Sequence, residues 1–288
     1  MMLLPADTHT ILGIRLKELK KSPLYQQLAE RRKLPQLDQF TAATGIDPRK
    51  EIWEIVVAST PQVPVVLVRG RFVEGGGGAA GMEPSIQRPG LRRLHYKGYT
   101  LIGDDQVVVT FLNTSVAVAG QPEAVRRIID GRDGSLGRPP RDLLSRIARI
   151  PSVNEMYLVS KAPVSSLLSA GFSGPLAGLK SMPVEIQMTT LATDWSAGVH
   201  LTGEIVSRDE ASARKLHEAV RGLIGLARLS AADGESRWSK FFDSVQLQHT
   251  GAKVELDAHV PLDLWERFLE TAGNPWQPNP SDQATTRQ

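Results

Sequence analysis

The sequence predicts an α+β protein made of two similar domains, each a mostly antiparallel sheet with helices packed on one face. Short runs rich in β-branched residues recur along the 288-residue chain and are joined by tight turns. Such turns favour antiparallel pairing, and helical stretches with one apolar stripe are suited to covering a sheet face. The order strand, helix, strands, helix occurs once in each half, which suggests two divergent copies of one domain.

Residues 1–130 are the predicted N-terminal domain. A strand in HTILGIRLK precedes a helix start at Ser22-Pro23, where serine is a candidate N-cap and proline takes the first helical position. Further short helices and two β-rich runs follow. After a glycine-rich segment come a strand in LHYKGYTLI, a turn at 103–105, a strand in VVVTFL and a turn at 113–114. The helix QPEAVRRIIDG closes this domain.

The second half repeats this order after a linker at residues 131–151 that contains one short helix in RDLLSRIARI. Residues 152–272 are the predicted C-terminal domain. Its long helix begins with a capping box of Ser207 and Glu210, and its last hairpin alternates cleanly, which places Val254, Leu256, Ala258 and Val260 on one face. Residues 273–288 are too polar and Pro-rich to order themselves, so we expect a disordered tail.

Composition excludes several classes of site. The chain has no cysteine, which excludes disulfides, thiol nucleophiles and Cys-ligated metals. No run approaches the roughly 18 apolar residues of a membrane helix, so we expect no transmembrane segment. Residues 1–149 carry 22 Lys/Arg against 15 Asp/Glu, a balance of +7, whereas residues 150–288 carry 12 against 16, a balance of −4. The cations of the basic half are scattered and lack stacking aromatics, so we do not expect nucleic acid as a partner.

The glycine run is the most suggestive motif and does not fit a cofactor site. Gly76, Gly78 and Gly81 have the spacing that cradles a dinucleotide pyrophosphate, and a β-rich run precedes them. That fingerprint needs a helix directly after the glycines, and the following MEPSIQRPG contains two prolines and a glycine. The acid expected downstream would be Asp104 or Asp105, which are typical hairpin-turn residues. We therefore predict a surface loop and no cofactor.

Other catalytic and metal-binding patterns also fail. Ser173 follows Gly171, but Pro175 stands where a nucleophile elbow needs glycine. The histidines lack the helical spacing of a zinc protease. His200 shares a strand face with Glu204, and Asp257 with His259, yet each pair offers only two ligands where a metal needs three or four. We expect no catalytic residues and no metal.

Trp276 is the one candidate interaction residue. It lies between prolines in the predicted disordered tail, and large aromatic side chains dominate binding energy at interfaces. The alternative is that it packs back against its own domain.

Three stretches carry a resemblance to a known group: LLPADTHTILGIRLKELKKSPL, TGIDPRKEIWEIVVAS and TSVAVAGQPEAVRRIID. In this order they resemble a family of uncharacterised bacterial proteins of unknown function, abundant in acidobacteria. The resemblance covers most of residues 3–130 and implies neither an activity nor catalytic residues. It implies a place in the cell envelope, because such proteins often begin with a leader that exports them.

The N-terminus MMLLPADTHT has no basic segment typical of a secretory leader. We expect a periplasmic or envelope location if a leader is missing from this chain, and a cytoplasmic one otherwise. The function favoured is a non-catalytic binding or interaction role in the envelope, with a protein or small molecule held between the halves or on an open sheet face. The alternatives are an enzyme whose site combines scattered residues and a polyanion binder that uses the basic half.

Overall fold

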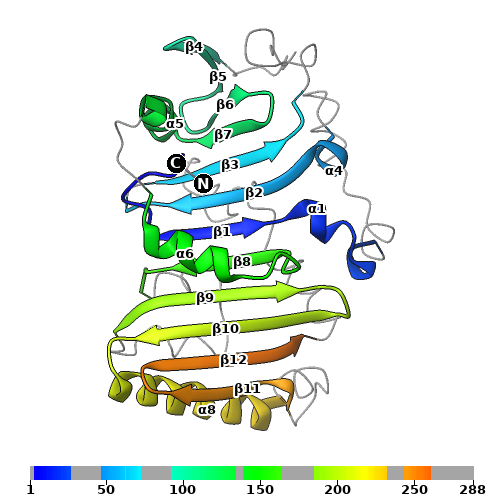
Figure 1. Cartoon of the computed structure of the whole chain (residues 1–288), viewed down its shortest axis with the longest axis vertical. Helices are drawn as coiled ribbons and strands as arrows, with labels where there is room; N and C mark the ends of the chain where they lie inside the picture. Colours follow the sequence, from blue (N-terminus) through cyan, green and yellow to red (C-terminus); the bar gives the residue numbers. More distant parts are fainter. Residues whose placement is uncertain are drawn as a thin grey trace, which may run out of the picture.

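The computed structural model describes residues 3–26, 47–61, 63–72, 92–133, 139–163, 185–231 and 243–260. All twelve named strands of this part of the chain form one antiparallel sheet (Figure 1). Its order is β11-β12-β10-β9-β8-β1-β2-β3-β7-β6-β5-β4. The strands are β1 (Thr10–Ile14), β2 (Ile52–Ser59), β3 (Pro64–Gly70), β4 (Arg92–Tyr96), β5 (Tyr99–Gly103), β6 (Val108–Asn113), β7 (Val116–Gly120), β8 (Met156–Ser160), β9 (Ile186–Asp194), β10 (Val199–Ser207), β11 (Gln246–Thr250) and β12 (Lys253–Val260).

The two halves of the chain meet inside this sheet, where β1 pairs with β2 on one side and with β8 on the other. The α+β class and the antiparallel sheet are therefore confirmed. Two similar domains with separate sheets are not confirmed, because the hydrogen-bond ladder runs without a break from one half into the other. The boundaries at residues 130 and 152 stay predictions.

Helices lie on both faces of this single sheet, whereas one covered face was expected for each of two separate sheets. The described helices are α1 (Leu16–Leu19), α4 (Pro48–Glu51), α5 (Pro122–Asp130), the 3₁₀ turn η1 (Gly131–Asp133), α6 (Arg141–Arg149) and α8 (Glu210–Ala231). The helices α5 and α6 contribute to the large core cluster on one face. On the opposite face, α8 packs its Ala213 and Leu216 against Ile205 and Val254, which are paired across β10 and β12.

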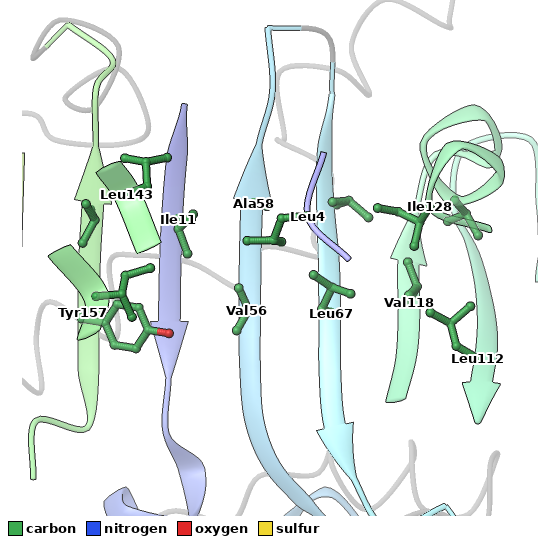
Figure 2. Packing of buried hydrophobic residues seen from close by; sticks show 14 of the residues in the cluster. Leu4, Ile11, Val56, Ala58, Leu67, Leu112, Val118, Ile128, Leu143 and Tyr157 are labelled. Carbon is green, nitrogen blue, oxygen red and sulfur yellow. The ribbon is translucent and has the colours of Figure 1, made fainter. Parts of the chain in front are cut away.

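The large core cluster extends along one face from β9 to β5 (Figure 2). Strand alternation directs every second side chain into it, and the apolar stripes of α5 and α6 cover it. Figure 2 shows Leu143 of α6 near Tyr157 and Ile11, and Ile128 of α5 near Val118. This burial makes α6, predicted as part of a linker, an integral element of the packed body.

Several local predictions are confirmed. Ser22 accepts a hydrogen bond from the Tyr25 backbone N–H at 3.1 Å, as an N-cap should. Strand β1 and the helices α5 and α6 lie within the stretches predicted for them, and β11 and β12 form the expected hairpin.

Two local predictions are wrong in detail. LHYKGYTLI is two strands rather than one, because Lys97 and Gly98 adopt positive φ angles of 46° and 81° and turn the chain tightly. Ser207 ends β10 instead of capping α8, and Asp209 accepts the hydrogen bond from the Ser212 N–H at 2.8 Å. Asp47 is the N-cap of α4 and accepts from the Arg49 N–H.

Candidate binding cleft

Beside α6, the sheet face that carries the large core cluster becomes polar and is hollowed. A cleft of about 390 Å³ lies between the C-terminal half of α6 and strands β9, β10, β12 and β11. Ile150, Pro151 and Asn154 continue its wall after the helix. The side chains and backbone that line it are Arg146, Arg149, Ile150, Pro151, Asn154, Thr190, Ala192, Thr202, Gly203, Glu204, Gln246, Gln248, Glu255, Leu256 and Asp257.

The register of four strands produces the polarity of this face. Residues that are directly opposite in a ladder point to the same side, so they form rows across the sheet. One row comprises Thr190, Glu204, Glu255 and Gln248, and the next comprises Ala192, Thr202, Asp257 and Gln246. Both rows line the cleft. The opposite face of β10, β11 and β12 carries the apolar residues that pack on α8.

Ion pairs connect α6 to the sheet at the centre of the cleft. Arg146 donates to Glu204, and both side chains are about four-fifths buried. Lys253 Nζ lies 3.4 Å from the other oxygen of the same carboxylate. Because Glu255 lies directly opposite Glu204, these cations also offset the repulsion between two neighbouring carboxylates. The exposed Arg149 has no ion-pair partner among the described residues and faces the cleft.

A third row continues the polar face beyond the cleft and gathers two histidines. His200 lies opposite Asp194 on β9 and opposite His259 on β12. The two imidazole rings are stacked with centroids 4.6 Å apart and an interplanar angle of 23°. His200 Nε2 lies 2.8 Å from Asp257 Oδ2. Together with Asp257 of the neighbouring row, the two histidines bring three potential metal ligands close to one another: His200, Asp257 and His259.

The pairs expected from the sequence are only partly brought together. Each pair shares a strand face, as expected, but His200 lies against Asp257 and His259, whereas Glu204 binds Arg146. The missing information was the register between β10 and β12, which no local pattern specifies. The sequence predicted no metal because each strand alone offers only two ligands, and the ligands that β10 and β12 contribute together were not visible.

Near this end of the sheet, two carboxyl groups, Asp194 and Glu155, have pKa values shifted in opposite directions. Hydrogen bonds from Ser196, with the nearby His200, hold the pKa of Asp194 below its usual range. Burial raises the pKa of Glu155, whose Oε2 accepts from the Trp195 backbone N–H at 3.0 Å. Asp194 and Glu18 raise the pKa of Glu155 further. Asp194 is thus a stable negative charge beside the histidines.

The other candidates from the sequence lie outside the described residues. Trp276, the loop at 76–81 and the stretch around Ser173 are all in this group, so their assigned roles stay predictions. In the basic half, many described cations are paired with acids, which disperses the positive charge. These pairs are Lys21–Glu18, Arg49–Asp47, Arg69–Glu54, Lys97–Asp130, Arg126–Glu123 and Arg127–Asp7.

Comparisons with known proteins bear on the fold alone. Neither the protein-family models nor the curated proteins contain a match to this chain. Crystal form III of the protein TP0453 is similar, with a TM-score of 0.56 and 7% identity over 93% of this chain and 96% of that chain. Crystal form I has a TM-score of 0.54 and 7% identity over 94% and 98%, and form IV has 0.52 and 9% over 92% and 96%. The likeness shows the fold.

The matches cover nearly the whole of both chains, so the likeness concerns the overall fold and not one part of it. At identities of 7–9%, these matches bear on the fold and not on the residues that line the cleft. Within the residues that the structure describes, no helix is both long and apolar enough to span a membrane.

Proposed function

We propose that this chain is a non-catalytic binding protein of the bacterial cell envelope that holds a small polar molecule in the cleft beside α6. The observation that carries this proposal is the change in the sheet face at β9. Up to that point α5 and α6 cover the face, whereas from β9 onward four strands present a hollowed polar surface that no other described helix covers. A volume of about 390 Å³ is within the range of small-molecule sites.

The lining indicates the chemistry of the molecule. Arg149 projects a charge that no described acid neutralises, which suits a carboxylate or another planar anionic group. The opposite wall offers Gln246 and Gln248, which donate and accept, and the carboxylates of Glu255 and Asp257, which accept from hydroxyl or amino groups. A small zwitterion or an acidic hydroxylated molecule would satisfy both walls.

A binding role fits this lining better than nucleophilic catalysis. A hydroxyl nucleophile needs a base within hydrogen-bond reach. Of the two threonines in the cleft, Thr202 donates to the carbonyl of Ala192 at 3.4 Å, and Thr190 has its hydroxyl buried. Glu204, the central carboxylate, is held by Arg146 and Lys253.

The envelope location is supported by the resemblance of residues 3–130 to exported bacterial proteins. Fractionation of the native host tests it, using an antibody to the chain and markers for cytosol and periplasm. Recovery with the periplasmic or membrane marker supports the location. Recovery with the cytosolic marker alone would refute it and leave the cleft proposal standing.

The cleft is tested by native mass spectrometry of the full chain purified from its host. We expect a bound small molecule in the wild type and its loss from the variants Arg149→Gln and Glu255→Gln. Arg214→Gln is the matched control, since Arg214 is an exposed cation of α8 on the opposite face. Equal occupancy in all four proteins, or no adduct in the wild type, would contradict binding in this cleft.

A further inference from the structure

We propose that His200, His259 and Asp257 form a site for one divalent transition-metal ion, with Zn²⁺ the best fit. The site lies on the polar face next to the cleft and shares only Asp257 with it. It goes beyond the proposed function, because a metal would bind there whether or not an organic molecule occupies the cleft.

The backbone ladder preorganises the two imidazoles. His200 and His259 are directly opposite on the paired strands β10 and β12, so their side chains leave the same face side by side. Asp257 precedes His259 by two residues and therefore points to that face as well. Seven further residue pairs of the same β10–β12 ladder, from Val199↔Val260 to Val206↔Lys253, fix this arrangement.

The distances are close to those of an assembled site. One ligand atom of each residue lies within 4.8 Å of the others, and His200 Nε2 and Asp257 Oδ2 are already 2.8 Å apart. Ligand atoms bound tetrahedrally to zinc at roughly 2.0–2.1 Å are about 3.4 Å from one another. Side-chain rotation can close such a difference without moving the strands.

The donor set selects the class of metal. Two imidazole nitrogens and one carboxylate oxygen suit Zn²⁺ and its neighbours in the first transition row, whereas Mg²⁺ and Ca²⁺ prefer oxygen ligands throughout. Asp194, opposite His200 on β9, adds a second negative charge nearby. His259 is exposed, so a fourth coordination position would open to solvent.

The second histidine pair of the described chain is a useful contrast. His217 of α8 and His249 of β11 have ring centroids 6.1 Å apart and tilted by 40°. No third ligand joins them in a three-residue group among the described residues. The proposal therefore assigns metal affinity to one histidine pair and not to the other.

The experiment uses the full chain after treatment with EDTA and dialysis. Isothermal titration with ZnCl₂ measures affinity and stoichiometry, and titration with CoCl₂ monitors visible d–d absorption. We expect one saturable Zn²⁺ site per chain in the wild type. His200→Gln and His259→Gln should each weaken binding by at least about tenfold, since even loss of an outer-shell partner costs 10–100-fold. His95→Gln, at an exposed position of β4, should bind as the wild type does.

Thermal unfolding provides a second readout that is independent of the spectra. Saturating Zn²⁺ should raise the unfolding temperature of the wild type and of His217→Gln but not of His200→Gln, and all three should unfold alike without metal. The proposal is wrong if the wild type shows no saturable binding, or if His200→Gln and His259→Gln retain wild-type affinity. Because these variants leave Arg149 and Glu255 intact, failure of the metal site does not affect the cleft test.

Discussion

Gly13 of β1 and Tyr157 of β8 are paired across the junction of the two halves of the chain, and the tyrosine ring fills the space that a side chain at Gly13 would need. Figure 2 shows the Tyr157 ring reaching from β8 towards β1. The ring is 2% exposed and belongs to the large core cluster. Arg15 places its guanidinium 4.8 Å from the ring centroid. This contact packs the two halves together where their ladders join.

The variant Gly13→Ala should destabilise the protein by about 1–3 kcal/mol, because the new Cβ would overlap the Tyr157 ring and force the strands or the ring to shift. Urea unfolding measures the change. In a Tyr157→Leu background the same substitution should cost at least about 1 kcal/mol less, since the obstructing ring is gone. Equal costs in both backgrounds would show that the ring is not the obstacle.

The Tyr157 hydroxyl gives a separate prediction. It is buried with no hydrogen-bond partner among the described residues, and burial raises its pKa to about 12. Removing an unsatisfied buried hydroxyl relieves its desolvation cost. Tyr157→Phe should therefore raise the free energy of unfolding by about 1 kcal/mol. A loss of stability in the same urea experiment would mean that the hydroxyl has a partner.

Local structure could be predicted from the sequence wherever a short-range pattern determines it. The alternation in the last hairpin correctly placed Val254 and Ala258 on a buried face, and proline and glycine correctly bounded α5. The join between the halves could not be predicted, because β1 pairs with a strand about 150 residues away. Such a ladder depends on tertiary packing that leaves no local signal.

The candidate sites show the same division. His200, Asp257 and His259 were visible as possible ligands, but their meeting depends on the β10–β12 register. A slip of β12 by one residue would turn Asp257 and His259 to the α8 face and leave His200 without them. The cleft was anticipated only as an open sheet face. Its second wall is α6, which the sequence placed in a linker and the core places against β8.

Glu155 should make stability depend on pH in a specific direction. The side chain is 4% exposed, and burial raises its pKa, so the folded protein holds the Glu155 proton more tightly than the unfolded chain. Stability from this group is therefore present below its unfolded pKa and lost as pH rises through the folded pKa. Glu155→Gln removes the buried charge, so its gain in unfolding free energy over the wild type should be larger at pH 7 than at pH 4.

Denaturant unfolding at the two pH values measures this difference. Glu123→Gln is the control, because Glu123 is an exposed acid of α5 paired with Arg126. Its difference from the wild type should be the same at both pH values. A Glu155→Gln gain that grows towards pH 4 would contradict a raised pKa for Glu155 in the folded protein.

Leu143 tests whether α6 is part of the core. It is fully buried among Ile11, Tyr157 and Val159, so Leu143→Ala should cost about 2–5 kcal/mol of unfolding free energy. Val153→Ala, at an exposed apolar residue shortly after the helix, should change stability by less than about 0.5 kcal/mol. If both substitutions have equally small effects, α6 does not pack into the core and is only a loosely attached linker.

Arg146 tests whether the ion pair at the centre of the cleft stabilises the fold. Arg146→Met keeps the apolar stem but leaves Glu204 facing Glu255 across the ladder, with only Lys253 to offset the repulsion. The pair is 22% and 23% exposed, between the surface pairs that contribute almost nothing and the buried pairs whose breakage costs several kcal/mol. We expect a loss of about 1–2 kcal/mol in urea unfolding.

Arg208→Met breaks a pair that is 65% and 68% exposed and should cost less than about 0.5 kcal/mol. Adding Glu204→Gln to Arg146→Met should recover at least about 0.5 kcal/mol, because the unpaired carboxylate is then absent. If the double variant is no more stable than Arg146→Met, the unpaired Glu204 carboxylate is not the cause of the loss and the stabilising role assigned to the ion pair is wrong.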